Sequence, residues 1–346
     1  MAAVIALNAG SSSIKLAVFS GETVVARREI QDLPADGSDH AAAIERALAD
    51  LDVATASCVG HRIVHGGARS GPALVTPALR EELERLVPLA PLHQPVCLAA
   101  LDAAMRAMPS ASHVACFDTA FHRTIPDLAR RYALPREYAE IIAYGFHGLS
   151  YEHIAGELPE HLGPVADGRV IVAHLGSGAS MCALRGRVSI ATTMGFTPLD
   201  GLVMATRPGT LDPGIALYLI EQRGLTASAV RDLFYHRSGL LGVSGEAASM
   251  KQLLASHSAA ARDAIDLFVY RCATAIGALA ATLGGLEALV FTGGIGEHSE
   301  VIRARITEAS RWLGGFATRV IATDEERVIA HQAISTAREQ PRWADE

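Results

Sequence analysis

The chain has 346 residues, of which half are hydrophobic and 19% are charged, and its formal net charge is -7. This length and apolar content predict two domains with buried cores, and the negative charge argues against a nucleic-acid-binding surface, which would need a basic patch. The five cysteines form no CxxC pair, a pattern typical of reduced thiols in a cytosolic protein. The N-terminus lacks the basic region of a signal peptide, and Glu287 and several glycines interrupt the longest apolar stretch, 275–291. We therefore expect a soluble cytoplasmic α/β protein without a membrane span.

The chain begins with a pattern typical of a strand followed by a hairpin. Residues 3–8 predict a buried strand, 14–20 a second strand, and 22–30 a third one after a turn at Gly21. A loop of small residues, with the sequence AGSSS, separates the first two strands. Helical spacing then predicts four helices, at 39–50, 76–88, 94–108 and 259–283. Short apolar runs typical of a sheet covered by helices predict three more strands, at 57–64, 112–118 and 286–292.

The strand-and-hairpin pattern occurs a second time at 169–190. There a strand, the loop LGSGAS, another strand, a turn at Gly186 and a third strand follow in the same order. A repeat of this spacing predicts two similar domains facing each other, although two hairpins can also resemble each other by chance. We place the domains at 1–149 and 150–329, and expect a C-terminal helix at about 330–346 to pack back on the first domain.

Three loops rich in glycine and serine could bind phosphate. The first hairpin tip can point backbone N–H groups and hydroxyls at an anion, with Lys15 facing the same phosphate. The loop Gly176–Gly178 offers the same arrangement in the second domain, and the stretch 292–299 follows a strand and leads into a helix. Each loop alone is more often a tight turn, but three in one chain favour a phosphate site. No P-loop motif occurs.

Four polar residues in apolar surroundings suggest transfer of phosphate to an acid. They are Arg62, Asp118, His147 and Arg207. Two arginines can neutralise a substrate carboxylate and the oxygens of a moving phosphoryl group, a reaction that depends on positioning and charge stabilisation. Each arginine alone would rather be interpreted as a surface or ion-paired side chain. Three further histidines are expected to form core hydrogen bonds: His61, His65 and His122.

Longer motifs over most of the chain resemble those of the acetate kinase family, within the superfamily of acetate and sugar kinases, hsc70 and actin. They read NAGSSSIK, GHRIVHGG, APLHQP, FDTAFH, YGFHGLS, HLGSGAS, MGFTPLDGLVMATRPGTLDPG and FTGGIGEHS. The resemblance implies two similar α/β domains with a duplicated ribonuclease H-like (actin-like ATPase) core, an active site in the interdomain cleft, and a homodimer. It implies reversible, direct in-line phosphoryl transfer from ATP to acetate, giving acetyl phosphate and ADP, with Mg²⁺ or Mn²⁺ as cofactor.

The resemblance also implies roles for single residues. The catalytic residues are Asp118, His147, Arg207 and Arg62. The acid and its methyl group would be held by Arg62, Val64, Leu92, His93, Phe146 and Pro198. Metal-linked residues are Asn8 and Glu325. Because acetate is already ionised at neutral pH, Asp118 is expected to orient the acid and to act with the metal rather than to remove a proton.

The nucleotide side departs from the family pattern. The resemblance assigns the following positions to nucleotide binding: Ser11, Ser13, Lys15, His174, Gly176, Ser177, Gly178, Ser249, Met250, Lys251, Gly294, Ile295, Gly296, Glu297 and His298. Among these, Ser249 replaces an aspartate, Lys251 an arginine, and Ser177 and His298 replace asparagines of the family. The chain is also shorter than is typical of the family, with much of a loop missing after 312–315.

These departures leave alternatives open. The donor site could accept other nucleotides or pyrophosphate, and the acid could be propionate, because a pocket separates acids that differ by one methylene by only about 1–3 kcal/mol. A non-catalytic homologue that binds a metabolite is a reading of another class, and the presence of all four catalytic residues argues against it. A serine hydrolase is weaker still, because no GxSxG nucleophile elbow occurs.

Overall fold

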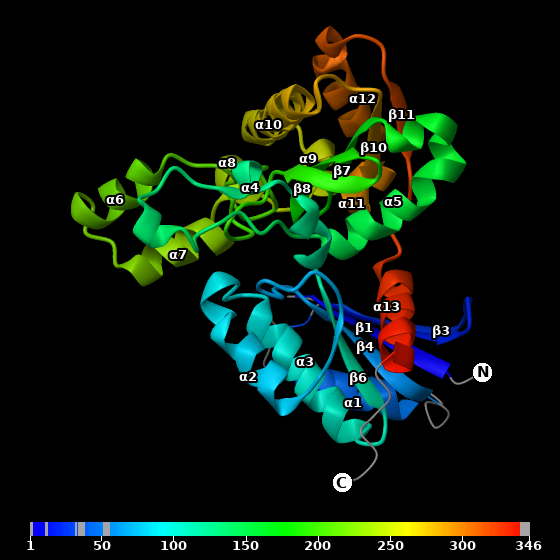
Figure 1. Cartoon of the computed structure of the whole chain (residues 1–346). Coiled ribbons are helices and arrows are strands. Elements are labelled where there is room, and N and C mark those ends of the chain that lie inside the picture. Colours follow the sequence, from blue (N-terminus) through cyan, green and yellow to red (C-terminus); the bar gives the residue numbers. More distant parts are fainter. Residues whose placement is uncertain (1–2, 11–12, 32, 34–38, 51–55, 340–346) are drawn as a thin grey trace. The chain divides into compact units, whose positions relative to one another are not determined.

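The computed structural model describes residues 3–10, 13–31, 33, 39–50 and 56–339 of the chain. Their contacts group the chain into two compact units, shown in Figure 1. The first unit consists of 1–123, 146–153 and 324–346, and the second of 124–145 and 154–323. Each unit contains one mixed β-sheet.

The sheet of the first unit has the order β3-β2-β1-β4-β6-β5. Its strands are β1 (Ala3–Ala9), β2 (Ile14–Ser20), β3 (Thr23–Ile30), β4 (Ala56–Ile63), β5 (Ala73–Leu74) and β6 (Ser112–Phe117). β1, β2 and β3 are antiparallel, whereas β1, β4 and β6 run parallel. β1 and β2 are nearly continuous in apolar residues because helices cover both faces of this sheet.

Helices cover the first sheet on its two faces (Figure 1). They are α1 (His40–Asp50), α2 (Pro77–Arg85), α3 (Gln94–Ala107) and α13 (Glu325–Glu339), and α5 (Gly148–Leu162) begins in this unit. α1 and α3 bury one apolar cluster, and α13 buries the other. Gly60 of β4 permits the approach of α13, since a Cβ there would lie 2.6 Å from the side chain of Ile329. The last helix therefore forms part of the core of the first unit.

The sheet of the second unit has the order β11-β10-β7-β8-β9. Its strands are β7 (Arg169–Leu175), β8 (Ala179–Arg185), β9 (Val188–Thr192), β10 (Ala288–Thr292) and β11 (Ala317–Val320). Its helices are α4 (Asp127–Arg130), α6 (Pro213–Glu221), α7 (Ala227–His236), α8 (Gly239–Ser244), α9 (Met250–Ala255), α10 (Ala259–Leu283), α11 (Gly293–His298) and α12 (Glu300–Ala309). By length and hydropathy α10 could span a membrane, but it packs along β7, β8 and three neighbouring helices as a core helix does.

Apart from β5, which has no counterpart, the two sheets have the same topology. In each, the first strand pairs antiparallel with the second and parallel with a later strand, so that β7, β8, β9, β10 and β11 correspond to β1, β2, β3, β4 and β6. This correspondence confirms the duplicated core expected from the repeated hairpin.

The chain passes between the two units at 123/124, 145/146, 153/154 and 323/324, rather than at the expected boundaries after 149 and 329. Residues 124–145 make their contacts within the second unit, where Phe196 N donates to the Tyr132 hydroxyl at 2.8 Å and Tyr144 N donates to the carbonyl of Gly195 at 3.0 Å. At the other end, the helix that packs on the first sheet starts at Glu325 rather than at about 330.

Candidate functional site

The two hairpin tips expected to bind phosphate occupy equivalent places in the two units. Gly10 N donates to Ser13 O at 2.8 Å between β1 and β2, and Gly176 N donates to Gly178 O at 3.0 Å between β7 and β8. Ser11, also expected in the first tip, lies outside the described residues. In the first hairpin Lys15 lies directly across from Asn8, so both side chains project from the same face of the sheet.

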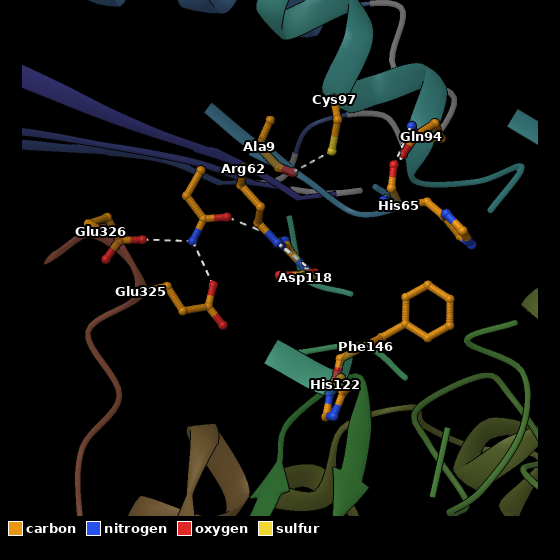
Figure 2. A network of polar contacts seen from close by, with 11 residues as sticks. Ala9, Arg62, His65, Gln94, Cys97, Asp118, His122, Phe146, Glu325 and Glu326 are labelled. Carbon is orange, nitrogen blue, oxygen red and sulfur yellow. Dashed lines mark hydrogen bonds and ion pairs between the residues drawn. The ribbon is translucent and has the colours of Figure 1, made fainter. Parts of the chain in front are cut away.

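A polar network lies at the carboxyl ends of three parallel strands of the first unit. Asn8 comes from β1, Arg62 from β4 and Asp118 from the residue that follows β6. Arg62 donates from Nε and a terminal nitrogen to Asp118 Oδ2, at 3.1 and 2.7 Å, and from its other nitrogen to Asn8 Oδ1 at 3.3 Å (Figure 2). Because parallel strands end at the same edge of a sheet, residues far apart in sequence meet there.

Asp118 is a buried carboxylate that is held by Arg62 through only one of its two oxygens. Its side chain is 1% exposed, and burial raises its pKa above the usual range while Arg62 partly offsets this. Burial alone would lower the pKa of Arg62, but the charges of Asp118 and Glu325 raise it above its usual value. Asp118 Oδ1 is buried and has no hydrogen-bond partner within the part of the chain that the structure describes. A buried acceptor of this kind is expected to be satisfied by a bound group.

The first residues of α13 complete the network. Asn8 Nδ2 donates to Glu325 Oε2 and to Glu326 Oε1, both at 2.8 Å (Figure 2). Burial, followed by the charge of Glu325, raises the pKa of Glu326. The structure thus brings together the two residues expected to be linked to a metal, Asn8 and Glu325. Glu326 was not foreseen, and the acidic run DEE at 324–326 is the signal that could have indicated it.

These side chains fit a magnesium ion. Mg²⁺ prefers oxygen ligands and is usually held by one or two carboxylates together with phosphate oxygens of the substrate. Glu325 and the unpartnered Oδ1 of Asp118 supply such oxygens. Over the described part of the chain, no group of three or more His, Cys, Asp or Glu side chains forms a complete metal site. The donor set therefore suits an ion that arrives with its substrate.

His147 is held next to Asp118 by a tight backbone approach. Gly148 N donates to Asp118 O at 2.8 Å, and a Cβ at Gly148 would collide with the same carbonyl. His147 itself has a left-handed backbone with φ of 60°. Strain of this kind in a non-glycine residue is typical of functional sites.

The residues expected to hold a methyl group are largely apolar and enclosed. Val64 and Phe146 are buried, and the Phe146 ring lies edge-on to the His65 ring with centroids 5.8 Å apart. Leu92 and His93 immediately precede α3. Pro198, the last residue of this set, belongs to the second unit.

His122 supports Phe146 and predicts acid sensitivity. Its ring lies 2.9 Å from Phe146 O through Nε2, and burial lowers its pKa to about 4. Between this pH and the usual value of about 6.5 the unfolded chain binds a proton that the folded chain does not, so stability falls by up to about 3 kcal/mol as the pH falls through this window.

We expect the melting temperature of His122→Gln to fall less between pH 7 and pH 5 than the melting temperature of the wild type. Thermal unfolding followed by circular dichroism measures it, with His257→Gln on an exposed histidine as control. A slope equal to that of the wild type would contradict the expectation.

Arg207 lies in the second unit without a carboxylate partner. One of its terminal nitrogens donates to Pro198 O at 2.8 Å, and no ion pair of Arg207 occurs among the described residues. Burial lowers its pKa to about 10, so it remains a cation at neutral pH. A partly buried arginine without an acidic neighbour is a binding place for an anion.

The residues expected around the nucleotide also lie in the second unit. His174 is the penultimate residue of β7, Ser249 is the N-cap of α9, and Lys251 is exposed on that helix. The glycine motif follows β10, forms the short helix α11 itself, and leads into α12, which begins at Glu300. Glu297 accepts from Gly293 N at 2.9 Å and from Thr323 N at 3.2 Å, so its carboxylate organises this turn.

Comparisons with known proteins agree on one family. The model of the Acetokinase family matches residues 20–338. An acetate kinase of Nitrobacter hamburgensis is 44% identical, with 97% of this chain and 96% of the relative covered. That alignment spans 388 positions, more than the 346 residues of this chain, so the relative contains internal segments that this chain lacks. An acetate kinase of Rhodopseudomonas palustris is 58% identical over 75% of this chain, and the match spans 66% of the relative's length.

Solved structures give the same result. The crystal structure of Porphyromonas gingivalis acetate kinase matches with a TM-score of 0.83 and 31% identity, over 97% of this chain and 100% of that chain. A propionate kinase from Francisella tularensis matches with a TM-score of 0.86 and 30% identity, over the same shares of the two chains.

Proposed function

Because the chain belongs to the acetokinase family, we propose that it transfers the terminal phosphoryl group of ATP reversibly to acetate, giving acetyl phosphate and ADP. The observation that carries the proposal is the network of Asn8, Arg62, Asp118 and Glu325, which joins a buried cation to carboxylate oxygens at one sheet edge. The reaction joins two anions, and such a site can neutralise the first of them.

The acid side depends on Arg62 and its neighbours. The guanidinium, fixed by Asp118, pairs with the substrate carboxylate, while the methyl group meets Val64 and Phe146. Acetate is ionised at neutral pH, so no base is required. Asp118 therefore orients Arg62, and its Oδ1, which has no partner among the described residues, would be available to bind a metal.

The phosphoryl side depends on positive groups placed before the reaction. In the first unit, Lys15 would stabilise oxygens of a phosphoryl group and His147 would donate to the developing charge. In the second unit, Arg207 is the cation that we assign to phosphate. Asn8, Asp118 and Glu325 would hold Mg²⁺, which neutralises charge on the donor phosphates when it is bound. The enzyme's contribution is to align the two oxygens with phosphorus in line.

The donor and the acid are open to variation. Ser249, Lys251 and His298 differ from the family pattern at the adenosine end, whereas backbone groups at a hairpin tip hold phosphate regardless of the base. A relaxed donor site, with GTP or pyrophosphate accepted, is therefore the second candidate. Similarity to a propionate kinase supports propionate as an alternative acid.

We also propose a homodimer in the cytoplasm. Five buried, unpaired cysteines support a reducing compartment. An apolar surface on and beside α6 supports self-association, because exposed apolar patches of this kind mark interfaces. It consists of Leu211, Ile215, Leu217, Tyr218 and Ile220.

If α6 is the dimer contact, Leu217→Glu yields a monomer at micromolar concentration, because a charge would be buried in an apolar interface. Size-exclusion chromatography with light scattering measures the mass. Val301→Glu, which changes an equally exposed residue of α12, is the control and should leave the mass unchanged. A dimer that persists in Leu217→Glu would place the contact elsewhere.

The proposed activity is tested by trapping acyl phosphate with hydroxylamine after incubation with acetate and Mg²⁺ATP. Hydroxamate formed by the wild type supports the proposal. Parallel reactions with GTP, pyrophosphate and propionate decide between the candidates, and a strong preference for ATP would rule out the relaxed donor site. No hydroxamate with any donor and acid would favour a non-catalytic homologue.

A further inference from the structure

Gln94 occupies an unusual position for a polar side chain. It is the first residue of α3 and is wholly buried. Its Oε1 accepts from His65 N at 3.0 Å, and its Nε2 donates to His65 O at 3.1 Å and to Leu83 O at 3.2 Å (Figure 2 shows the two bonds to His65). One side-chain amide thus pairs with both backbone groups of one residue, as a neighbouring strand would.

These bonds join segments that are separate in the chain. His65 follows Val64 at the end of β4, Leu92 and His93 directly precede Gln94, and Leu83 belongs to α2. The His65 ring in turn contacts the Phe146 ring. Three of the apolar residues assigned to the acid pocket are therefore connected through this one amide.

The connection is rigid for physical reasons. If the loop after β4 moved away from α3, the two hydrogen bonds between Gln94 and His65 would break at once. The buried amide would then be left without these partners, which destabilises the folded state. The side chain has a fixed length, so it sets the distance between the backbone at His65 and the start of α3.

We propose that Gln94 is a positioning residue that sets the spacing of Val64 from Leu92 and thereby the length of the carboxylic acid that the site accepts. The inference rests on the proposed carboxylate kinase activity and adds its selectivity. Because one methylene changes the specificity ratio by about 10- to 200-fold in an apolar pocket, a small change in this spacing is measurable.

Two substitutions move the spacing in opposite directions. Gln94→Met has a similar volume but cannot bond to His65, so the loop is released and the pocket widens. Gln94→Asn keeps the amide on a side chain one methylene shorter, so the loop is drawn towards α3 and the pocket narrows. General destabilisation cannot produce opposite changes in selectivity.

The experiment measures kcat/KM for acetate, propionate and butyrate, and KM for ATP, in the wild type and both variants. We expect the propionate-to-acetate ratio to rise about tenfold in Gln94→Met and to fall in Gln94→Asn, with KM for ATP within twofold of the wild type. Gln332→Met is the matched control and should leave the ratio unchanged: Gln332 lies on α13, and its side-chain amide donates a partly buried hydrogen bond to Glu152 of α5.

Each outcome decides the inference. A ratio that stays at the wild-type value in both variants, with kcat reduced for every acid alike, overturns it. If Gln94→Met does not fold, the direction of the change in Gln94→Asn decides. A wild type that forms no acyl phosphate at all overturns the proposed function, whereas an active wild type with constant ratios overturns only the role of Gln94.

Discussion

Asp118→Asn should lower kcat by about a thousandfold while the protein remains folded. The substitution keeps the size of the side chain and one oxygen. It removes the negative charge that accepts both hydrogen bonds from Arg62, and it removes one of the two carboxylate oxygens, of which Oδ1 has no partner among the described residues. We expect stability to fall by no more than about 3 kcal/mol, because Glu325 still faces Arg62. The hydroxamate assay, run well below the melting temperature of the variant, measures the effect.

Asp102→Asn is the matched control for this prediction. Asp102 also binds an arginine through two bonds, from Arg80 Nε and a terminal nitrogen at 2.9 Å each, but it lies on α3 away from the network. Its variant should keep the wild-type kcat. An Asp118→Asn enzyme with more than a tenth of the wild-type kcat would contradict the role assigned to this carboxylate.

Arg207→Met should lower kcat at least a thousandfold without lowering the melting temperature. The activity is lost because an arginine that stabilises phosphoryl transfer has no replacement. Stability is retained because Arg207 has no acidic partner among the described residues, and burial already lowers its pKa to about 10, so the substitution removes an unfavourable buried charge. Kinetics and thermal unfolding of the same preparation measure both effects.

Arg80→Met gives the opposite pattern and is the control. Arg80 pairs with Glu84 and Asp102, so its loss should lower stability slightly and leave kcat unchanged. Arg207→Lys should recover only part of the activity, because lysine lacks the planar fork. A marked drop in the melting temperature of Arg207→Met would contradict this prediction and show that the bond from Arg207 to Pro198 O stabilises the fold.

Features encoded locally could be predicted from sequence. α10 was expected at 259–283 and has these bounds because Ser258 caps its first turn, accepting from Ala261 N at 3.0 Å, and Gly284 ends it with a left-handed backbone. The duplicated hairpins could be predicted for the same reason, since strand periodicity and turn residues lie within one short segment.

Features that depend on distant contacts could not be predicted in this way. The bond from Asn8 to Glu326 joins residues 318 positions apart, and nothing near either residue indicates it. The sequence likewise does not indicate that Gln94 is buried, because a glutamine at the start of a helix is ordinarily exposed. Of the site, the residue types and their strand ends followed from motifs, whereas the hydrogen bonds that hold them needed the fold.

The packing of α13 also affects how the protein matures on the ribosome. Val328, Ile329, Ala330 and Ala333 of this helix fill one face of a sheet whose strands are synthesised far earlier. Until they emerge, that apolar face is without its cover and is a target for chaperones. Glu325 arrives on the same helix, so the nascent chain gains the carboxylate that we propose binds metal and the cover of its apolar sheet face in one event. A premature stop codon before this helix would therefore leave an inactive, aggregation-prone fragment and no partly active enzyme.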